Sequence, residues 1–415
     1  MALRTDVVII GAGQAGLAMS RCLTDFGIDH IVIDRGAVGQ RWRAERWASL
    51  RLLTPNWMTR LPGGGYDGAD PEGFMHKDEV VGFLNRYARS FDAPVREYVT
   101  VLDVSRADEG FRVETSEGCY LSRSVVVATG ACDRPAVPGF AKDLSPSIAQ
   151  VTTKTYVHPD MLEEGGVLVV GASATGVQLA EEIHMSGRPV TLAVGSHVRL
   201  PRRYRGRDIM HWLDASGLLG EQRDPAIEPE RVLRQPSLQL VGGLPARDIG
   251  LVSLARIGVR LTGRVEAGQE NRLGLCDGLA FEVARADARG DRLLDRIDNH
   301  IESNALSAPD AERSVALNFN PSAVDQLDLS AAGIGTIVWA TGFRRDYPWL
   351  RVPVLGADGE IQQHGGVTTE PGLYTLGLPF MRRRNSTFID GVGDDARDLS
   401  LHIAAFLGET RALAA

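Results

Sequence analysis

The stretch DVVIIGAGQAG, from Asp6 to Gly16, decides the fold of this chain. Four apolar β-branched residues lead into Gly11, and Gly13 and Gly16 complete a G-x-G-x-x-G spacing. In this pattern the first glycine permits a tight turn, the second lets a pyrophosphate approach the backbone, and the third lets a helix pack closely on the strand. The helix that follows directs its first N–H groups at the phosphates. The stretch therefore predicts a dinucleotide site.

The residues after this turn complete a Rossmann-like unit. Leu17–Phe26 has the spacing of an amphipathic helix, and His30–Asp34 is typical of a second strand. Asp34 lies 18 residues beyond Gly16, where a carboxylate can accept hydrogen bonds from a pair of ribose hydroxyls. A glycine-rich turn without a ligand is the alternative interpretation, and the strand, the helix and the carboxylate together favour the dinucleotide site.

The composition excludes several other classes of protein. A chain of 415 residues holds two or three domains, and its net charge of −8 indicates neither a nucleic-acid partner nor a membrane surface. The four cysteines lie far apart, so we expect a reducing compartment, no zinc and no redox-active disulfide. No apolar run approaches the roughly 20 residues of a membrane span. We therefore expect a cytoplasmic enzyme. We also expect no bound metal.

A second unit repeats the first in the middle of the chain. Val167–Gly171 is typical of a strand, GASATG of the glycine turn, and Val177–Met185 of the helix. Ser173 replaces the middle glycine, and it is small enough for a pyrophosphate to approach. The sequence therefore predicts two dinucleotide sites in one chain.

The second unit lacks the acidic residue that follows the second strand of the first. Gly195, Ser196 and His197 stand there, and Arg199 and Arg202 come shortly after. A 2′-phosphate is bound where cations replace the carboxylate, so the sequence favours NADPH over NADH. A solvated basic loop is the alternative interpretation of these arginines.

The order of the motifs indicates a nested layout of α/β class. A buried strand ends in ATG at residues 340–342, and a short strand and an amphipathic helix close the chain. We therefore expect two Rossmann-like dinucleotide-binding domains, the second inserted into the first. The first domain would comprise residues 1–155 and return over 329–415, and the second would span 156–328. Residues 208–325 carry no motif.

Two dinucleotides in one chain allow electrons to pass between them, and hydride transfer from nicotinamide to flavin is the simplest assignment. Together these motifs resemble the class B flavoprotein monooxygenases, such as the flavin-containing and Baeyer–Villiger monooxygenases, and their small bacterial CzcO-type relatives. The resemblance rests on GAGQAG with Asp34, on the W-x-S-L-R-L-x-T-P stretch from Trp47 to Pro55, on the ATG segments at residues 128–130 and 340–342, and on GASATG. It implies the fold of the glutathione reductase-like flavoproteins with two dinucleotide domains.

The resemblance also implies a set of ligands for each cofactor. The residues implied for FAD are Gly11, Gly13, Gln14, Ala15, Gly16, Asp34, Arg35, Arg41, Trp42, Val101, Gly130 and Asp394, with Thr341 and Gly342 in the second ATG segment. Those implied for NADPH are Gly171, Ser173, Ala174, Thr175, Gly176, Arg199 and Arg202. Asn56 matches an asparagine that faces the flavin, and its catalytic role competes with that of a turn or N-cap residue.

One family motif is degraded in this chain. The fingerprint F-x-G-x-x-x-H-x-x-x-Y/F precedes the second glycine turn in the family, but here Pro146, Ile148 and Thr152 replace the first three signature residues. Only Tyr156 matches. An enzyme that reduces its flavin without inserting oxygen into a substrate is therefore an open alternative.

The resemblance implies a monooxygenase that uses FAD and NADPH. NADPH would reduce FAD, and a C4a-(hydro)peroxyflavin would transfer one oxygen atom of O₂ to a small organic substrate. The alternatives are an NAD(P)H-dependent reductase or oxidase without oxygen insertion and a non-catalytic protein that senses NADPH. No motif in the sequence identifies the substrate. The oligomeric state is open, and a homodimer is one alternative.

Overall fold

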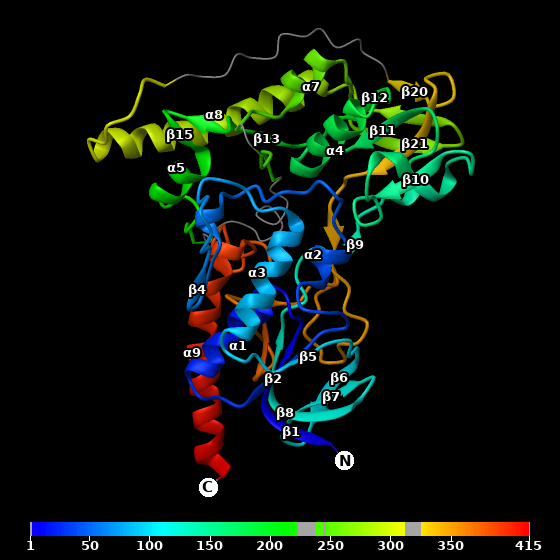
Figure 1. The fold of residues 1–415 in the computed structure, drawn as a ribbon. Coiled ribbons are helices and arrows are strands. Elements are labelled where there is room, and N and C mark those ends of the chain that lie inside the picture. Colours follow the sequence, from blue (N-terminus) through cyan, green and yellow to red (C-terminus); the bar gives the residue numbers. More distant parts are fainter. Residues whose placement is uncertain (1, 223–236, 244–245, 312–324, 415) are drawn as a thin grey trace.

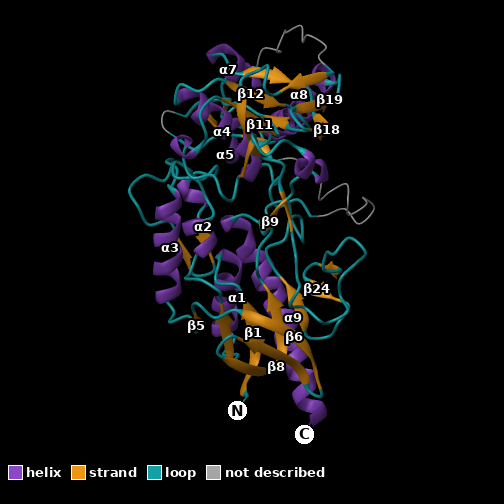
Figure 2. Cartoon of the chain, turned by 90° about the vertical axis from the view of Figure 1, so that its right-hand side faces the viewer, coloured by secondary structure: helices purple, strands orange, loops and turns teal. Residues whose placement is uncertain are grey.

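The computed structural model describes residues 2–222, 237–243, 246–311 and 325–414. Two bodies are visible in Figure 1: the lower one contains β1, α1, α3 and α9, and the upper one contains β11, α4, α7 and α8. Both chain ends lie at the far end of the lower body in both views (Figures 1 and 2). The upper body is therefore formed by the middle of the chain.

The first sheet lies in the lower body and has β1 near its centre. Its order is β23-β24-β25-β8-β1-β2-β5, and β7 pairs with β8 and β6 at its side. Its strands are β1 (Leu3–Ile10), β2 (His30–Ile33), β5 (Val95–Arg96), β6 (Val101–Ala107), β7 (Gly110–Thr115), β8 (Gly118–Val127), β23 (Gln363–His364), β24 (Val367–Thr368) and β25 (Leu373–Thr375). The helices of this body are α1 (Gln14–Asp25), α2 (Gln40–Ala44), α3 (Lys77–Arg89) and α9 (Ile389–Ala414).

The second sheet lies in the upper body and has the order β10-β21-β11-β12-β17. Its strands are β10 (Ala149–Thr152), β11 (Gly166–Val170), β12 (Val190–Ala193), β17 (Arg260–Thr262) and β21 (Ile334–Trp339), all paired in parallel. The helices of this body are α4 (Ala174–Met185), α5 (Ile209–Ala215), α7 (Leu251–Ile257) and α8 (Leu279–Ser303).

Short ribbons and single-turn helices complete the fold. The remaining strands are β3 (Arg60–Leu61), β4 (Gly64–Gly65), β9 (Arg134–Pro135), β13 (Val198–Arg199), β14 (Arg203–Tyr204), β15 (Arg207–Asp208), β16 (Leu238–Gln239), β18 (Val265–Gln269), β19 (Arg272–Leu275), β20 (Gln326–Asp328) and β22 (Phe343–Arg344). The short helices are η1 (Asn56–Met58), η2 (Gly139–Asp143) and η3 (Pro159–Met161). The β9–β22 ribbon lies where the chain passes between the two bodies (Figure 2).

The nested α/β layout is present, but strand pairing differs from the expected domain boundaries. β10 and β21 both pair in the second sheet, whereas boundaries at residues 155 and 329 assign them to the first domain. The reason is that a buried strand ending in ATG has the same local pattern in either sheet, and only its partners distinguish them. Part of the motif-free region 208–325 lies outside the described residues.

Each body has its own buried core. In the lower body, apolar side chains of α1, α3 and α9 pack with those of the first sheet, and Leu17, Leu84 and Val392 are fully buried. In the upper body, Val167, Val177 and Leu192 belong to a second cluster. Both glycine turns therefore lie where a buried strand meets a buried helix.

No helix among the described residues is long and apolar enough to cross a membrane.

Candidate dinucleotide-binding sites

The first glycine turn joins β1 to α1, and its geometry requires glycine at two positions. Gly11 has a φ of +111°, and a Cβ at this residue would overlap the carbonyl oxygen of Ala128 at the end of β8. A Cβ at Gly16 would overlap the carbonyl oxygen of Gly11. Gly13 has open space where its Cβ would point. The turn is therefore closed on its inner side and open toward a ligand.

Asp34 follows β2 and is tied to the same turn. Its Oδ2 accepts a hydrogen bond from the Ala12 N–H at 2.7 Å, and its Oδ1 accepts one from the Gly36 N–H at 2.8 Å. Burial raises the pKa of this carboxyl, and the two N–H donors oppose that rise. The carboxylate is therefore held rigidly, and each of its oxygens keeps lone pairs for further donors.

A cavity of about 650 Å³ opens beside this turn. Its volume is within the usual range for cofactor sites. The expected FAD residues that line it are Gly11, Gly13, Gln14, Ala15, Asp34, Arg35, Arg41, Trp42 and Gly130, with Val101 at the start of β6. Gly16 lies behind the turn, where it permits the contact between α1 and β1. These residues were expected from separate motifs, and the fold brings them together.

Arg41 supplies the clearest sign of an anionic ligand in this cavity. Its Nη2 donates to Asp133 Oδ1 at 3.2 Å, but its Nη1 is buried without a hydrogen-bond partner among the described residues. A Cβ built on Gly130 would lie 4.0 Å from that Nη1. A buried guanidinium N–H without a partner costs free energy, and a phosphate oxygen would remove that cost. The lining therefore fits the pyrophosphate of a dinucleotide.

Trp42 and Gln14 connect the cavity to the start of α9. The Trp42 Nε1–H donates to Gln14 Oε1 at 3.3 Å, and Gln14 Nε2 donates to the Thr387 carbonyl at 3.4 Å. Thr387 and Val392 also line the cavity. Consequently the N-terminal end of α9, where N–H groups lack helical partners, lies at this end of the cavity.

The sequence predicts Asp394 in a turn before the last helix, but Asp394 lies within that helix. α9 begins at Ile389, so Asp394 is in its second turn, where it is exposed and pairs with Arg397 at 2.7 Å. Helical geometry directs this side chain to solvent, away from the cavity. Asp394 is not among the residues that line the cavity, so its position does not support the expected FAD contact.

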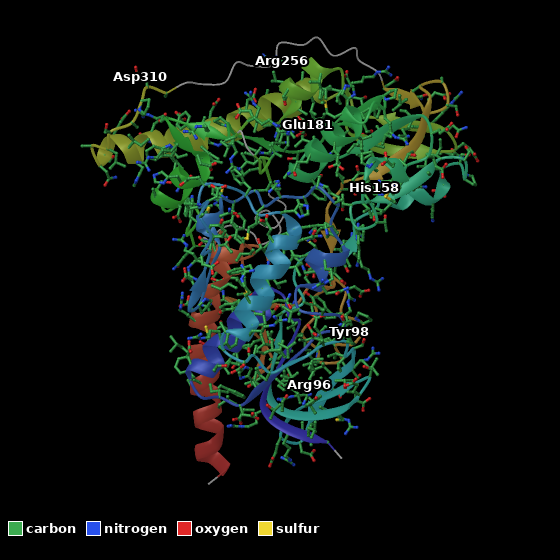
Figure 3. The ribbon with its side chains drawn as sticks, in the orientation of Figure 1. Arg96, Tyr98, His158, Glu181, Arg256 and Asp310 are labelled. Atoms are coloured by element: carbon green, nitrogen blue, oxygen red, sulfur yellow. The ribbon has the colours of Figure 1, made fainter. Side chains whose placement is uncertain are left out.

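Asn56 has a structural role in this structure. It is 5 % exposed, its Nδ2 donates to the Asp70 carbonyl at 2.8 Å, and its Oδ1 accepts from the Met75 N–H at 2.7 Å. It borders a second cavity, of about 570 Å³, between the two bodies. Glu181 of α4, labelled in Figure 3, lines the same space and pairs with Arg247 at 2.7 Å. The Asn56 amide thus holds a loop, as its turn-residue interpretation predicts.

The second glycine turn joins β11 to α4 and repeats the inner contacts of the first. Gly171 has a φ of +110°, and a Cβ there would overlap the Ala340 carbonyl oxygen at the end of β21. A Cβ at Gly176 would overlap the Gly171 carbonyl oxygen. Thr341 Oγ1 donates to the Ala136 carbonyl at 2.8 Å. The ATG segment of Thr341 and Gly342 therefore belongs to the second unit, which corrects its expected place at the FAD.

The outer side of the second turn is covered by the chain itself. Ser173 Oγ donates to the Ser237 carbonyl at 2.9 Å, and Gln239 Nε2 donates to the Ala172 carbonyl at 2.6 Å. Ala174 and Thr175 form the first turn of α4 behind Ser173. A phosphate that approaches this turn therefore meets the Ser237 segment, whose carbonyl is bonded to Ser173.

Val194 occupies the place in the second unit that Asp34 occupies in the first. The Gly11 N–H donates to Ile33 O, one residue before Asp34, and the Gly171 N–H donates to Ala193 O, one residue before Val194. Val194 is fully buried. The absence of a carboxylate at this position, expected from the sequence, is therefore a feature of the equivalent site itself.

The two arginines expected at the 2′-phosphate are engaged elsewhere. Arg199 Nε donates to Asp287 Oδ1 on α8 at 2.8 Å. Arg202 is 1 % exposed, forms two 2.7 Å hydrogen bonds with Asp208, and donates from Nη1 to the Leu53 carbonyl at 2.7 Å. This burial leaves no room for a nucleotide contact of Arg202, because Asp208 and the Leu53 carbonyl accept its hydrogen bonds and the Phe74 ring lies 4.6 Å from its guanidinium.

The sequence interpretation missed Arg289, which the fold places beside the end of β12. Its Nη1 donates to Ser196 Oγ at 2.7 Å and to the His197 carbonyl at 3.1 Å. The signal available in the sequence was Gly290, a glycine inside a helical pattern, which marks close packing of another element.

The fold and these sites define an oxidoreductase with two dinucleotide-binding units. A family model described as pyridine nucleotide-disulphide oxidoreductase matches residues 8–213. The uncharacterized oxidoreductase CzcO-like of Geobacillus kaustophilus is 32% identical over 397 residues, covering 95% of this chain and 97% of that relative. The chain belongs to the CzcO-like oxidoreductase family.

Solved structures confirm the predicted fold class. A flavin-containing monooxygenase from Stenotrophomonas maltophilia has a TM-score of 0.66 at 17% identity, covering 97% of this chain and 99% of that one. The OTEMO complex with FAD and NADP has a TM-score of 0.56 at 16% identity, covering 99% of this chain and 87% of that one. These likenesses concern the fold.

Proposed function

We propose that this chain is an FAD- and NADPH-dependent monooxygenase that acts on a small organic substrate. The first unit would hold FAD and the second NADPH. FAD would supply the redox chemistry with NADPH and O₂ when bound, and the residues of the first unit would hold and orient it. The solved relatives named as a flavin-containing monooxygenase and as a complex with FAD and NADP support this proposal.

The observation that carries the proposal is the buried Nη1 of Arg41 in the cavity beside Asp34, which has no hydrogen-bond partner among the described residues. In this proposal Arg41 donates to the pyrophosphate, and Asp34 accepts from the ribose hydroxyls. Gly13 leaves room for the phosphates, and Trp42 packs at the inner end of the cavity.

The protein would position the flavin and exclude water from the cavity. The start of α9 would place its positive end beside the flavin, favouring negative charge there. Trp42 and Gln14 fix one wall of the cavity through their 3.3 Å hydrogen bond. A wall of this kind excludes water, which protects reactive species from side reactions.

The test compares three rates in the purified, FAD-loaded protein: NADPH oxidation, O₂ uptake and H₂O₂ release. A panel of amines, sulfides, ketones and amino acids is added in turn. The proposal expects one class to accelerate NADPH oxidation without matching H₂O₂ release, with an oxygenated product by mass spectrometry. Stoichiometric H₂O₂ for every compound would indicate the oxidase alternative, and a protein that binds NADPH but no flavin would indicate the sensing alternative.

We also propose a cytoplasmic location and a homodimer. A cytoplasmic location would be tested by fractionation of the native host's cells, with the protein expected in the fraction that contains soluble enzymes. A homodimer would be tested by analytical ultracentrifugation of the purified protein, where a single species of twice the 44.9 kDa chain mass is the expected result.

A further inference from the structure

The end of β12 is the place where a Rossmann-like unit distinguishes NADPH from NADH, because the adenosine ribose lies there. In this chain the residues that follow β12 are Val194, Gly195, Ser196 and His197. Ser196 is exposed and Val194 is fully buried. A ligand for a 2′-phosphate must therefore reach this loop from another element.

Helix α8 brings a guanidinium to this loop. Arg289 Nη1 donates to Ser196 Oγ at 2.7 Å and to the His197 carbonyl at 3.1 Å. These two bonds hold one edge of the guanidinium against the loop, and three further N–H donors of the group remain for another ligand. Arg289 is half-buried, so the group is positioned and still reachable.

The packing of α8 explains why Arg289 reaches the loop. A Cβ at Gly290 would overlap the carbonyl oxygen of Arg199 in β13, so only glycine permits this close approach. One turn of α8 is also fixed to β13 by the ion pair between Asp287 and Arg199, at 2.8 Å. Arg289 is therefore carried by a rigid helix that rests directly on the strand after the loop.

Several charged groups beside this loop are paired with one another. The Arg264 side chain lies 3.8 Å from a Cβ built on Gly195 and pairs with Glu266 at 2.6 Å. Asp287 is paired with Arg199, and Glu282 with Arg285 at 3.6 Å. Within the described part of the chain, Arg289 itself has no carboxylate partner. His197 is 1 % exposed, and burial lowers its pKa, so its ring adds no positive charge near neutral pH.

We infer that Arg289, together with the Ser196 hydroxyl, binds the 2′-phosphate of NADPH. The inference deepens the proposed function and rests on it for the identity of the second dinucleotide. A guanidinium can donate two parallel N–H bonds to a phosphate, and a hydroxyl can add a third donor. This assignment replaces Arg199 and Arg202, whose guanidinium groups face carboxylates inside the protein.

The test measures binding of adenosine 2′,5′-bisphosphate and of 5′-AMP by calorimetry, with the full-length, FAD-loaded protein. The wild-type protein should bind the bisphosphate more tightly than AMP. Arg289→Ala should weaken the bisphosphate by about 10-fold to 100-fold, the usual range for hydrogen bonds to a charged group, and leave AMP unchanged. Arg289→Lys should restore part of the loss, because it keeps the charge without the planar fork.

Arg285→Ala is the matched control, since it removes the same charge from α8 one turn earlier, where Arg285 pairs with Glu282. It should leave both ligands unchanged. A wild-type preference for the bisphosphate that survives in Arg289→Ala would overturn the inference and leave the proposed function standing. A wild-type protein that binds neither adenosine ligand would overturn the NADPH assignment itself.

Discussion

The two glycine turns have nearly the same backbone and very different surroundings. Gly13 and Ser173 precede their helices with φ and ψ angles of −84° and −172° and of −79° and −173°. The first turn faces a cavity of about 650 Å³, whereas the second is bonded to the Ser237 carbonyl. The glycine pattern therefore determines the turn, and the residues around it determine the ligand.

The same contrast holds at the end of the second strand of each unit. Asp34 accepts two backbone N–H bonds in the first unit, and the buried Val194 stands in its place in the second. A carboxylate at this position favours ribose hydroxyls and repels a 2′-phosphate. We therefore expect substitutions in the two units to affect different ligands.

The largest expected effect concerns Arg202, which the structure assigns to packing between the units. Arg202→Ala would leave Asp208, which is 7 % exposed, without its partner. Breaking a buried ion pair in this way costs about 3–5 kcal/mol of the free energy of unfolding. Urea unfolding measures the loss, and Arg199→Ala, which removes a more exposed ion pair, should cost clearly less. A stable Arg202→Ala protein with a changed preference between NADPH and NADH would contradict this assignment.

The next effect concerns the first unit. Asp34→Asn keeps the size of the side chain but removes its charge and one acceptor for the ribose hydroxyls. Hydrogen bonds to charged groups contribute about 1.5–3 kcal/mol, so FAD should dissociate about 10-fold to 100-fold more readily, as measured by equilibrium dialysis. Asp25→Asn, which alters only the exposed pair with Arg21 on α1, should not change FAD binding. Weaker NADPH binding with unchanged FAD would reverse the roles of the units.

A smaller effect should follow when the second turn is made like the first. Ser173→Gly removes the hydrogen bond to the Ser237 carbonyl, so less free energy is needed to uncover the turn. One neutral hydrogen bond contributes about 0.5–1.5 kcal/mol, so the KM for NADPH should fall about 2-fold to 10-fold. FAD content should not change. A raised KM would show that the Ser173 hydroxyl itself contacts the nucleotide.

The reciprocal change, Gly13→Ser, is the matched comparison. A Cβ at Gly13 meets no protein atom within 4 Å, so the folded protein should accept the side chain. Because it points into the space expected for the pyrophosphate, it should weaken FAD binding while the thermal unfolding temperature of the flavin-free protein stays the same. Loss of that stability would show that Gly13 serves the fold.

The smallest effect is a pH dependence that the units share. His30 Nδ1 lies 2.8 Å from the Ile28 carbonyl, and burial lowers the pKa of His30 as it lowers that of His197. The unfolded chain, with a histidine pKa of about 6.5, then takes up protons that the folded one does not. The free energy of unfolding should therefore have its full value above this pH and fall as the pH drops through it. His30→Gln should flatten this fall in urea unfolding between pH 7 and pH 5, and an unchanged slope would contradict it.

The sequence predicted those features that depend on neighbouring residues. Both glycine turns, Asp34 and the missing second acid follow from local spacing, because the connection from strand to helix is built in the same way in each unit. The strand β21 was placed in the wrong sheet because its own residues do not specify whether β8 or β11 lies beside it. Pairing between distant strands is a property of the whole fold.

The charged residues show the same limit. Arg199 and Arg202 are close to the nucleotide loop in the sequence, yet Arg199 is paired with Asp287 of α8 and Arg202 with Asp208. Arg289 is far away in the sequence and reaches Ser196 because α8 packs on β13. Counting charges near a motif does not reveal which of them are already neutralised.

The central claim, that one unit holds FAD and the other supplies electrons from NADPH, is tested most directly by anaerobic mixing. The purified protein is loaded with FAD, and flavin absorbance is followed in a stopped-flow spectrometer after addition of NADPH or NADH. The account predicts one FAD per chain, reduced faster by NADPH than by NADH at equal low concentrations. A chain that binds no FAD, or one whose bound flavin NADPH does not reduce, would contradict it.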